Sequence, residues 1–568
     1  MPLPVRRRPR PRRTGPCRAA PRTSPAWSSG ARATDVPLPH GGADRRRLHP
    51  PGPADGGPRC RSVLYQALRA RAPFPRGSSR RGTARPRPRP FGPRSHRGAG
   101  AHGRTAGPRA VTHASTPAFR GDAVMSTPVL TGPSAELDDL SVWPASTARL
   151  PGGNLSVGGV SLTDVAERFD TPAYVLDEGE VRARCRTYRA VFPDADVLYA
   201  AKAFLSRAMV RWIDEEGLGL DACSAGELEL AVMAGFPAAR IVLHGNAKSP
   251  RDIETALRLG VGRIVVDSPS EIARLAAQVG SGGRQKVMVR VVPGVSAGGH
   301  EKIRTGTDGQ KFGLSLTDGS AQHAIARVLG QPQLELTGLH CHIGSQITDV
   351  KPYLVAVRRM VGLMARIKES HGVTFPELDM GGGHGVAYRA GESALDLTAL
   401  ARRLNGELSA SCAAAGLPVP RLVIEPGRAV AAPAGVAVYR VLAVKPTGST
   451  MFVAVDGGMS DNPRPALYGA RYAPRLVGRS TTAEPVATTV VGRHCEAGDI
   501  LAADVLLPGD VRPGDLLAVP VSGAYQLSMA SDYNLVGRPP VVAVHDGSAR
   551  LLVRRETQED FRRRDIGA

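Results

Sequence analysis

The chain has 568 residues and a formal net charge of +23, and all of this excess charge lies in its first 124 residues. Residues 1–124 hold 27 Arg and 4 Asp and no Lys, Glu, Ile or Asn, whereas residues 125–568 hold 47 basic and 47 acidic side chains. Seven irregularly spaced cysteines exclude a disulfide framework and a zinc pattern, and no apolar run reaches the length of a membrane span or a secretory signal. We therefore expect a reduced, cytoplasmic protein with no membrane partner.

Three interpretations compete for residues 1–124. An Arg-rich arm suits nucleic acid, and an Arg-rich, acid-poor segment also suits a transit peptide, although only Ser62–Ala72 is weakly amphipathic. The third interpretation is translated upstream DNA of a GC-rich genome, because Arg, Pro, Gly and Ala have GC-rich codons and Lys, Ile and Asn do not. We favour the third, with a start at Met125, over the basic arm, and we do not expect a nucleic-acid partner. Under any of them, a segment so rich in Pro, Gly and charge is predicted to be disordered.

The neutral part begins with a predicted flexible lead-in at 125–150 and an apolar–polar stretch at 155–169. Thr171–Asp177 then predicts a strand, and Glu178–Ala190 predicts a helix whose acidic first turn suits the helix dipole. After it, a unit of apolar strand, turn and helix repeats. The predicted strands are Val197–Ala201, Gly219–Ala222, Ile241–His244, Arg263–Asp267, Lys286–Val292, Leu336–His342, Glu377–Met380 and Leu422–Glu425. The helices between them are predicted at Ala225–Ala234, Arg251–Leu259, Ser270–Gln278, Ser320–Leu329, Lys351–Ser370 and Leu397–Ala415.

Eight apolar strands separated by helices over about 250 residues predict a (β/α)8 barrel. A doubly wound sheet is the alternative, but no Gly-x-Gly-x-x-Gly opens a helix after the first strand. After residue 435 the pattern changes to short β-like runs split by Gly, Pro and Asp, which predicts an all-β domain. These runs are Val436–Val444, Met451–Val455, Pro485–Gly492, Asp515–Val521 and Pro540–Asp546. We expect the barrel at 171–435 and the β-domain at 436–568, joined by an N-terminal strand from 125–170.

Lys202 directly follows the first predicted strand of the repeat. A lysine at that position would project from the carboxyl end of the strand, where α/β folds place their chemistry. For an isolated lysine, a solvated position at the rim is the better interpretation, because burial without a partner is costly. Other motifs here also lie at strand ends, which favours a functional lysine. A partly desolvated lysine that forms a Schiff base with an aldehyde fits the placement.

Two further motifs close the seventh and eighth strands. Gly381-Gly382-Gly383 would leave backbone N–H groups unobstructed for a phosphate, although a glycine run is usually only a loop. Glu425-Pro426-Gly427-Arg428 carries a carboxylate that could keep a pyridinium nitrogen protonated. A surface salt bridge between Glu425 and Arg428 is the alternative, and we prefer the functional interpretation because the motif ends a strand of the same barrel.

The sixth strand ends in His340-Cys341-His342-Ile343-Gly344-Ser345-Gln346. His-x-His places two imidazoles on one face of a strand, but no carboxylate or cysteine cluster completes a metal site, so no metal is expected. An imidazole stacked on an aromatic cofactor, with a serine donating to its phosphate, would use His342 and Ser345. His340 is interpreted as a core histidine.

Together these motifs resemble the fold-type III PLP-dependent decarboxylases, and most closely the diaminopimelate decarboxylases of bacterial lysine synthesis. The resemblance extends from about residue 150 to near the C-terminus. It implies a PLP-binding (β/α)8 barrel with a C-terminal all-β domain, as in alanine racemase. The motifs that carry it are Y-A-A-K-A-F (199–204), H-I-G-S-Q (342–346), G-G-G (381–383), E-P-G-R (425–428), D-G-G-M-S-D-N-P-R-P-A-L-Y (456–468), H-C-E-A-G-D (494–499) and G-A-Y (523–525).

By this resemblance, Lys202 carries pyridoxal phosphate as an internal aldimine, His342 stacks on the ring and Glu425 contacts the ring nitrogen. The other implied cofactor contacts are Ser345, Gly381, Gly382, Gly383, Pro426, Gly427, Arg428 and Tyr525. The implied substrate contacts are Arg428, Arg464, Tyr468, Glu496 and Tyr525.

The resemblance also implies that Cys495 is the proton donor. Cys495 and Glu496 would reach the active site of the partner subunit, which implies a homodimer with shared sites. Taken alone, Cys495 would be interpreted as a small buried apolar residue, and Arg464 and Glu496 as solvated.

The implied reaction is decarboxylation of meso-2,6-diaminopimelate to L-lysine and CO2. The far end of this substrate presents an ammonium and a carboxylate, which call for an acid such as Glu496 and a base such as Arg464 or Arg428. The rivals are an ornithine, arginine or carboxynorspermidine decarboxylase on the same fold, and a non-catalytic PLP-binding protein. The latter would lack the β-domain that carries Cys495 and Tyr525.

Overall fold

The structure is a computed structural model that describes residues 139–298, 305–448 and 450–567. The interpretations of residues 1–124 and the first part of the lead-in lie outside these ranges. The chain divides into two units, Met1–Arg120 and Gly121–Ala568, and the described residues all belong to the second. Among them, no helix combines the length and apolarity that a membrane span requires.

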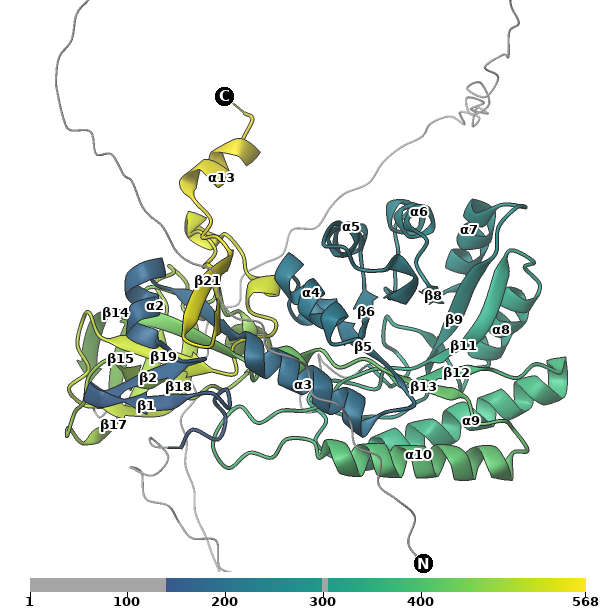
Figure 1. Ribbon diagram of the computed structural model, residues 1–568, viewed down its shortest axis with the longest axis horizontal. Helices are drawn as coiled ribbons and strands as arrows, with labels where there is room; N and C mark the ends of the chain where they lie inside the picture. The colour runs from purple at the N-terminus through teal and green to yellow at the C-terminus, as the bar shows by residue number, and fades with distance from the viewer. Residues whose placement is uncertain (1–138, 299–304, 449, 568) are drawn as a thin grey trace, which may run out of the picture. The chain divides into compact units, whose positions relative to one another are not determined.

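Eight parallel strands form a closed barrel (Figure 1). Each strand pairs with the next in chain order, and the pairing of β13 with β5 closes the ring. The barrel strands are β5 (Asp196–Ala200), β6 (Gly219–Ala222), β7 (Ile241–Leu243), β8 (Arg263–Val266), β9 (Gln285–Val292), β11 (Leu334–His340), β12 (Glu377–Asp379) and β13 (Arg421–Ile424). A two-residue strand, β10 (Leu314–Ser315), pairs in parallel with the end of β9 and is not one of the eight barrel strands. The predicted barrel is confirmed, with strand ends shifted by one or two residues.

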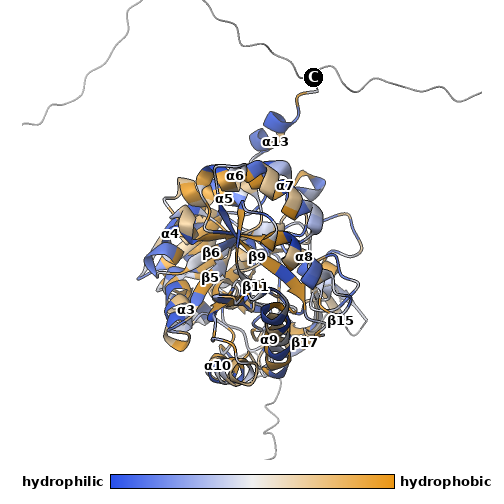
Figure 2. Ribbon diagram, turned by 90° about the vertical axis from the view of Figure 1, so that its right-hand side faces the viewer, coloured by the Kyte–Doolittle hydropathy of each residue, from blue (hydrophilic) through white to orange (hydrophobic). Residues whose placement is uncertain are grey.

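The helices surround the strands, as Figure 2 shows. They are α3 (Glu178–Val191), α4 (Arg207–Glu215), α5 (Ala225–Met233), α6 (Pro250–Leu259), α7 (Pro269–Val279), α8 (Ser320–Leu329), α9 (Lys351–His371) and α10 (Leu397–Ala414). Four successive helices begin at a serine whose hydroxyl accepts a hydrogen bond from the backbone three residues on, a strong start signal. These serines are Ser206, Ser224, Ser249 and Ser268. Each serine cap sets the residue at which a helix begins. It therefore also sets the length of the turn between strand and helix at the barrel mouth.

The barrel interior is filled by side chains and is not a pore. A separate cluster of buried apolar residues comes from five strands, and it consists of Leu198, Val242, Val265, Met288 and Val423. The much larger second cluster lies between strands and helices and continues into the β-domain. Because side chains fill the interior, a functional site of the barrel is expected at the ends of the strands.

The second large sheet follows the order β18-β17-β15-β14-β4-β20-β21; β19 also pairs with β14, and β16 pairs with β19. Its strands are β4 (Ala173–Asp177), β14 (Gly435–Thr447), β15 (Thr450–Val455), β16 (Arg475–Val477), β17 (Pro485–Val491), β18 (Ile500–Pro508), β19 (Leu516–Pro520), β20 (Val541–His545) and β21 (Ser548–Val553). The helices that accompany it are α12 (Arg464–Tyr468) and α13 (Gln558–Arg564). The all-β domain is present, although β16, β18 and β21 were not predicted. In β16 and β21, only the side chains of Leu476 and Val477 are buried. These two strands therefore show little of the apolar pattern that predicts a strand.

One domain boundary needs correction. The strand that joins the β-domain from before the barrel is β4, between β14 and β20, and it lies after residue 170. All five of its side chains are buried, so its sequence resembles that of a barrel strand. Residues 148–161, by contrast, form a small antiparallel sheet of their own, made of β1 (Ala148–Leu150), β2 (Asn154–Val157) and β3 (Val160–Ser161), ahead of α2 (Leu162–Phe169).

Candidate active site

Lys202 lies at the barrel mouth, in the single turn η2 (Ala201–Ala203) that follows β5. Its Nζ is 3.4 Å from Oδ2 of Asp221, a residue of β6 that is 1% exposed. Burial lowers the pKa of Lys202, but the negative charge of Asp221 and of weaker neighbours outweighs it, so the pKa is raised. Lys202 is therefore a cation with a buried counter-ion, and 43% of its side chain remains exposed.

Glu425 lies at the end of β13 with its carboxylate against two imidazoles. Its Oε1 is 2.7 Å from Nε2 of His244 and its Oε2 is 3.5 Å from Nε2 of His340. Burial raises the pKa of Glu425, but His244 and His340 lower it well below the usual value, so the group is ionised. Within the described part of the chain, Oε1 has no aligned hydrogen-bond donor, because the close imidazole does not point its N–H at the oxygen. A buried carboxylate thus keeps an oxygen available to a donor.

His340 is more than a core histidine. It is 1% exposed, as expected, but its ring lies edge-on to His244 at 4.9 Å between centroids. Burial lowers its pKa to about 3 although Glu425 acts the other way. His244, His340 and Glu425 are also close enough together to hold a metal ion, so a carboxylate does lie near this histidine, while the expectation of no metal stays a prediction. The fold brings His340 to His244, from another strand, as well as to the carboxylate.

The glycine run fits into a space that excludes side chains. A Cβ on Gly382 would lie 2.0 Å from the carbonyl oxygen of Glu425, and a Cβ on Gly383 would lie 2.1 Å from that of Gly344. The N–H of Gly381 donates to Oδ1 of Asp379 at 2.8 Å. The run is therefore wedged between the loops that follow β11 and β13, which places its backbone beside both.

His342 is neutral. Burial lowers its pKa well below the usual value, and the charge of Lys202 lowers it further. Its Nδ1 accepts a hydrogen bond from the N–H of Gly382 at 3.2 Å, and its carbonyl accepts one from the Thr305 hydroxyl at 2.8 Å. The proton of the neutral ring therefore belongs on Nε2.

The turn Glu425–Arg428 is tied to the Lys202 segment. The N–H of Ala200 donates to the carbonyl of Pro426 at 3.1 Å. A Cβ on Gly427 would lie 2.9 Å from the methyl group of Ala200. Arg428 begins the short helix α11 (Arg428–Ala431) and donates to the hydroxyls of Tyr388 and Ser345, at 2.6 and 2.9 Å.

Arg464 is a second buried guanidinium near Arg428. It donates to the hydroxyl of Tyr472 and lies 4.8 Å from the ring centroid of Tyr388, whose hydroxyl Arg428 also contacts. Arg428 and Arg464 are 7% and 6% exposed, and neither forms an ion pair with a carboxylate of residues 139–298, 305–448 or 450–567. Within the described ranges, the side-chain hydroxyls that these guanidiniums contact belong to two tyrosines and a serine.

Tyr525 connects the β-domain to the barrel mouth. Its N–H donates to the carbonyl of Ala203, next to Lys202, at 2.8 Å. Its ring lies 4.7 Å from the guanidinium of Arg428. Its backbone has φ +60°, an uncommon conformation for a tyrosine. The structure thus brings together Lys202, His342, Ser345, the glycine run, the Glu425–Arg428 turn, Arg464 and Tyr525.

Cys495 and Glu496 are separate from this group. Both are exposed, and no hydrogen bond or ion pair of the described residues links either to Lys202 or Glu425. Their loop is held from behind, since Asp499 accepts from the N–H groups of His494 and Met459 at 2.8 and 2.6 Å. Tyr468, at the end of α12, is half-buried.

Comparison with known proteins agrees with this geometry. Residues 178–432 match the family model described as "Pyridoxal-dependent decarboxylase, pyridoxal binding domain". The diaminopimelate decarboxylase of Actinosynnema pretiosum subsp. auranticum is 57% identical over 428 residues, which cover 75% of this chain and 96% of that protein. The enzyme of the same name from Mycobacterium tuberculosis is 48% identical, over 74% of this chain and 97% of that protein.

The chain belongs to the diaminopimelate decarboxylase family. A crystal structure of the M. jannaschii diaminopimelate decarboxylase in complex with L-lysine has a TM-score of 0.70 and 31% identity, over 75% of this chain and 98% of that one. The barrel and the β-domain are therefore the shared architecture of these decarboxylases.

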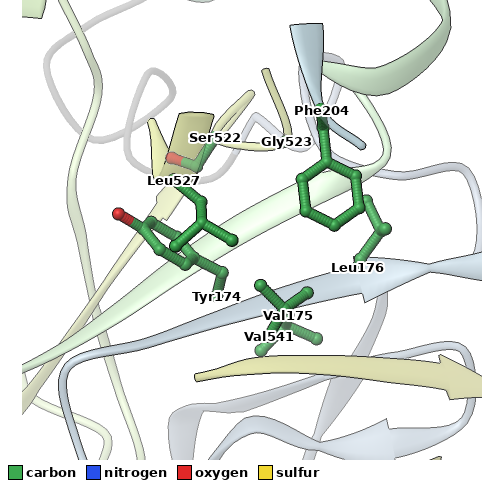
Figure 3. Close-up of a pocket in the computed structure, with 8 residues that line it drawn as sticks. All are labelled: Tyr174, Val175, Leu176, Phe204, Ser522, Gly523, Leu527 and Val541. Atoms are coloured by element: carbon green, nitrogen blue, oxygen red, sulfur yellow. The ribbon is translucent and has the colours of Figure 1, made fainter. Parts of the chain in front are cut away.

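Figure 3 shows a cavity beside the family's lysine motif, and it is too small to be the substrate site. The side chains of Phe204, Leu176 and Leu527 face a space of about 20 Å3 between the barrel mouth and the β-domain. This volume admits about one water molecule. The cavity is a packing gap behind the site.

Sequence reasoning missed several polar residues of this decarboxylase site. Asp221 lies in β6 and His244 directly follows β7, so polar residues at strand ends were a usable signal. Tyr388 and Tyr472 lie in loops and carry no such signal. Only the fold brings their hydroxyls to Arg428 and Arg464.

Proposed function

We propose that this protein decarboxylates meso-2,6-diaminopimelate to L-lysine and CO2, the last step of lysine biosynthesis, with pyridoxal phosphate as cofactor. The observation that carries the proposal is the meeting of Lys202 and the ionised Glu425 at one barrel mouth. When bound, this cofactor supplies a sink for the electron pair that the departing CO2 leaves behind. The names of the relatives support the choice of substrate.

The residues at the mouth fit this cofactor. Its aldehyde requires an amine, which Lys202 offers. Its ring nitrogen requires a carboxylate, and Oε1 of Glu425 is buried without an aligned donor. Its phosphate requires donors, which Gly381–Gly383, Ser345 and Arg428 would provide from backbone and side chains.

Each residue has a defined task in this proposal. Glu425 would hold a proton on the ring nitrogen, and its depressed pKa keeps it ionised for that purpose. His342, being neutral, would pack against the ring face without adding a charge. Asp221 would hold the amine of Lys202 when the substrate's amine takes its place. Pro426, Gly427 and Tyr525 would complete the cofactor site.

The two arginines support a substrate with a second carboxylate. Arg464 and Arg428 are buried, lie side by side on Tyr388 and have no described carboxylate partner. Holding the carboxylate that must leave would stabilise the ground state, so the better use of Arg464 is the far carboxylate. Ornithine has no carboxylate there. Tyr468, Glu496 and Tyr525 would complete the substrate contacts, with Glu496 at the far ammonium.

Cys495 would return a proton to the carbon that loses CO2. Because Cys495 and Glu496 are exposed, their proposed positions are in the active site of a second copy of the chain, which makes the protein a homodimer with shared sites. A cytoplasmic location is part of the same proposal.

The test is an absorbance scan of the full chain with pyridoxal phosphate, followed by addition of meso-diaminopimelate and an assay for lysine. We expect a bound-cofactor absorbance band that Lys202→Ala lacks, together with release of lysine and CO2. A coloured protein that decarboxylates ornithine, arginine or carboxynorspermidine instead would move the assignment to that branch. A coloured protein without turnover on any of them would be a cofactor carrier, and a colourless folded one would contradict the role of Lys202.

A further inference from the structure

His244 contacts two buried carboxylates that serve opposite ends of the site. Its Nε2 is 2.7 Å from Oε1 of Glu425 and 3.8 Å from Oδ1 of Asp221. The other oxygen of Asp221 is 3.4 Å from Nζ of Lys202. The imidazole, 5% exposed in its side chain, thus lies between Glu425 and the counter-ion of Lys202.

The two carboxylates of this chain depend on side-chain partners. Asp221 and Glu425 are 1% and 3% exposed in their side chains, and water cannot stabilise two carboxylates at that depth. Lys202 faces Asp221 and is 3.4 Å away, which leaves Glu425 to the imidazoles. The His244 ring lies between these two carboxylates, with one nitrogen close to both.

Other titratable groups surround His244, and none of them reaches both carboxylates. His340 contacts only Glu425, at 3.5 Å. Burial and then the carboxylate of Glu425 raise the pKa of Asp379 well above the usual value, so it is protonated. Asp267, after β8, feels the charge of His244 and is paired with Arg290 at 3.7 Å. The Cys223 thiol reaches Oδ1 of Asp221 at 3.9 Å but has no hydrogen bond to Glu425 among the described residues, so the contact with both carboxylates belongs to His244.

We propose that His244 is a positioning residue that couples the carboxylate for the cofactor's ring nitrogen to the counter-ion of Lys202. The proposal rests on the proposed function, because it assigns Glu425 and Lys202 to one cofactor. Its Nε2, 2.7 Å from Oε1 of Glu425 and 3.8 Å from Oδ1 of Asp221, sets the spacing of the two carboxylates. Protonation at the two ends of the cofactor is then interdependent.

The experiment compares the holoenzyme with His244→Gln, His244→Leu and His340→Gln, and uses His384→Gln as the control. His384 is another buried barrel histidine; its Nδ1 is 2.8 Å from the hydroxyl of Tyr188. For each protein, the dissociation constant of pyridoxal phosphate and the pH midpoint of the bound cofactor's absorbance are measured, with thermal stability alongside. The wild type is first shown to bind the cofactor and to release lysine, because failure at that step contradicts the proposed function and not the coupling.

We expect His244→Leu to weaken cofactor binding at least about tenfold, the usual effect of removing a polar neighbour of a buried charge. We also expect its absorbance midpoint to rise by about one unit, because the polar side chain between the two carboxylates is lost. His244→Gln keeps a polar side chain at this position and should show smaller changes in the same directions. His340→Gln should weaken binding without moving the midpoint.

Two results would overturn the proposal. One is a folded His244→Gln whose midpoint and cofactor affinity equal those of His384→Gln. The other is a midpoint in His340→Gln that moves as far as in His244→Gln, because the contact with Asp221 would then not be the cause. If His244→Leu does not fold, His244→Gln alone decides.

Discussion

At the scale of single residues, the unusual feature is a pair of buried guanidiniums that have no carboxylate partner among the residues the structure describes. Buried arginines normally have an acidic partner, because an unpaired charge in the interior is costly. Arg428 and Arg464 instead share Tyr388, and Arg464 also contacts Tyr472. Burial raises the pKa of the Tyr388 phenol, but the two arginines outweigh it and lower that pKa. An anionic group that binds at this pair would meet hydrogen-bond donors that are already oriented.

Replacing Arg464 by lysine tests this pair. Arg464→Lys keeps the charge but loses the planar fork and the stacking on Tyr388, so we expect kcat/KM for diaminopimelate to fall about 10- to 100-fold, mainly through KM. Steady-state kinetics and the cofactor absorbance check this, since the cofactor band should be unchanged. Arg479→Lys, at a surface ion pair with Asp510 and Asp515, should change neither. Unchanged kinetics in Arg464→Lys would remove the residue from the substrate site.

A site residue could be predicted when a local sequence motif indicated its role, and could not when its role depends on a long-range contact. Lys202, Glu425 and the glycines follow strands of a repeating pattern, and Arg464 lies in a long motif, so local sequence was sufficient. His244 was recognised only as the end of a strand, because its significance is a 2.7 Å contact with a residue 181 positions later in the chain. Tyr388 and Tyr472 likewise depend on contacts that only the folded chain makes.

At the scale of elements, the loop after β12 is determined by backbone contacts. Gly382 has backbone atoms of Glu425 and Pro426 as its nearest neighbours, and neither can move without displacing β13. The exclusion of side chains fixes the distance between the glycine run and the Glu425–Arg428 turn.

Two alanine substitutions of glycine should therefore have opposite effects. Gly382→Ala places a methyl group 2.0 Å from the carbonyl oxygen of Glu425, and we expect loss of cofactor binding and a lower Tm. Gly406→Ala, within α10 and with no atom within 4 Å of the new Cβ, should stabilise the protein by about 0.5–1 kcal/mol. Thermal melts and cofactor titration of both variants check this. Normal cofactor binding in Gly382→Ala would show that the loop is not confined.

A second element, the turn between β15 and α12, contains a pH-sensitive carboxyl group. Asp461 accepts hydrogen bonds from the N–H of Gly458 at 2.5 Å and from the Tyr439 hydroxyl at 2.7 Å. Burial nevertheless raises its pKa from 3.8 to about 7. The turn leads directly into Arg464, so its protonation state affects the segment that carries a proposed substrate residue.

The sign of the effect on stability follows from this raised pKa. Between pH 3.8 and about 7 the folded protein holds a proton that the unfolded chain releases, so its contribution is full below that window and is lost as pH rises through it. We expect the wild type to lose a few degrees more in Tm between pH 5 and pH 8 than Asp461→Asn, which cannot titrate there. Calorimetry at both pH values measures this. If the Tm of the wild type and that of Asp461→Asn change equally between the two pH values, Asp461 does not titrate in this range.

The elements themselves were largely predictable, because the barrel strands are apolar runs and the helices start at serine caps. The exceptions were elements without an apolar signal, such as β21, and β4, whose five buried side chains fit either sheet. Hydrophobic pattern shows that a strand is buried but not which sheet covers it.

At the scale of the whole molecule, the exposure of Cys495 has a direct consequence. If this thiol serves the partner's site, a dimer of two defective chains can contain one complete site. We expect Lys202→Ala and Cys495→Ala to be inactive separately and to regain about a quarter of wild-type activity when mixed under conditions that exchange subunits. Activity of the mixture is the measurement. No recovery, with exchange verified by a tagged chain, would place Cys495 in its own subunit's site or outside the chemistry.

The position of β4 also concerns how the protein is made. This strand emerges from the ribosome before any barrel strand, but its neighbours β14 and β20 are synthesised only after the whole barrel. Long-range pairing of this kind is slow, and exposed strand edges promote aggregation in the meantime. During synthesis the barrel can close around its own contacts while β4 stays unpaired. Completion of the β-domain sheet, and with it the placement of Tyr525 beside Lys202, is therefore a late step that requires almost the entire chain.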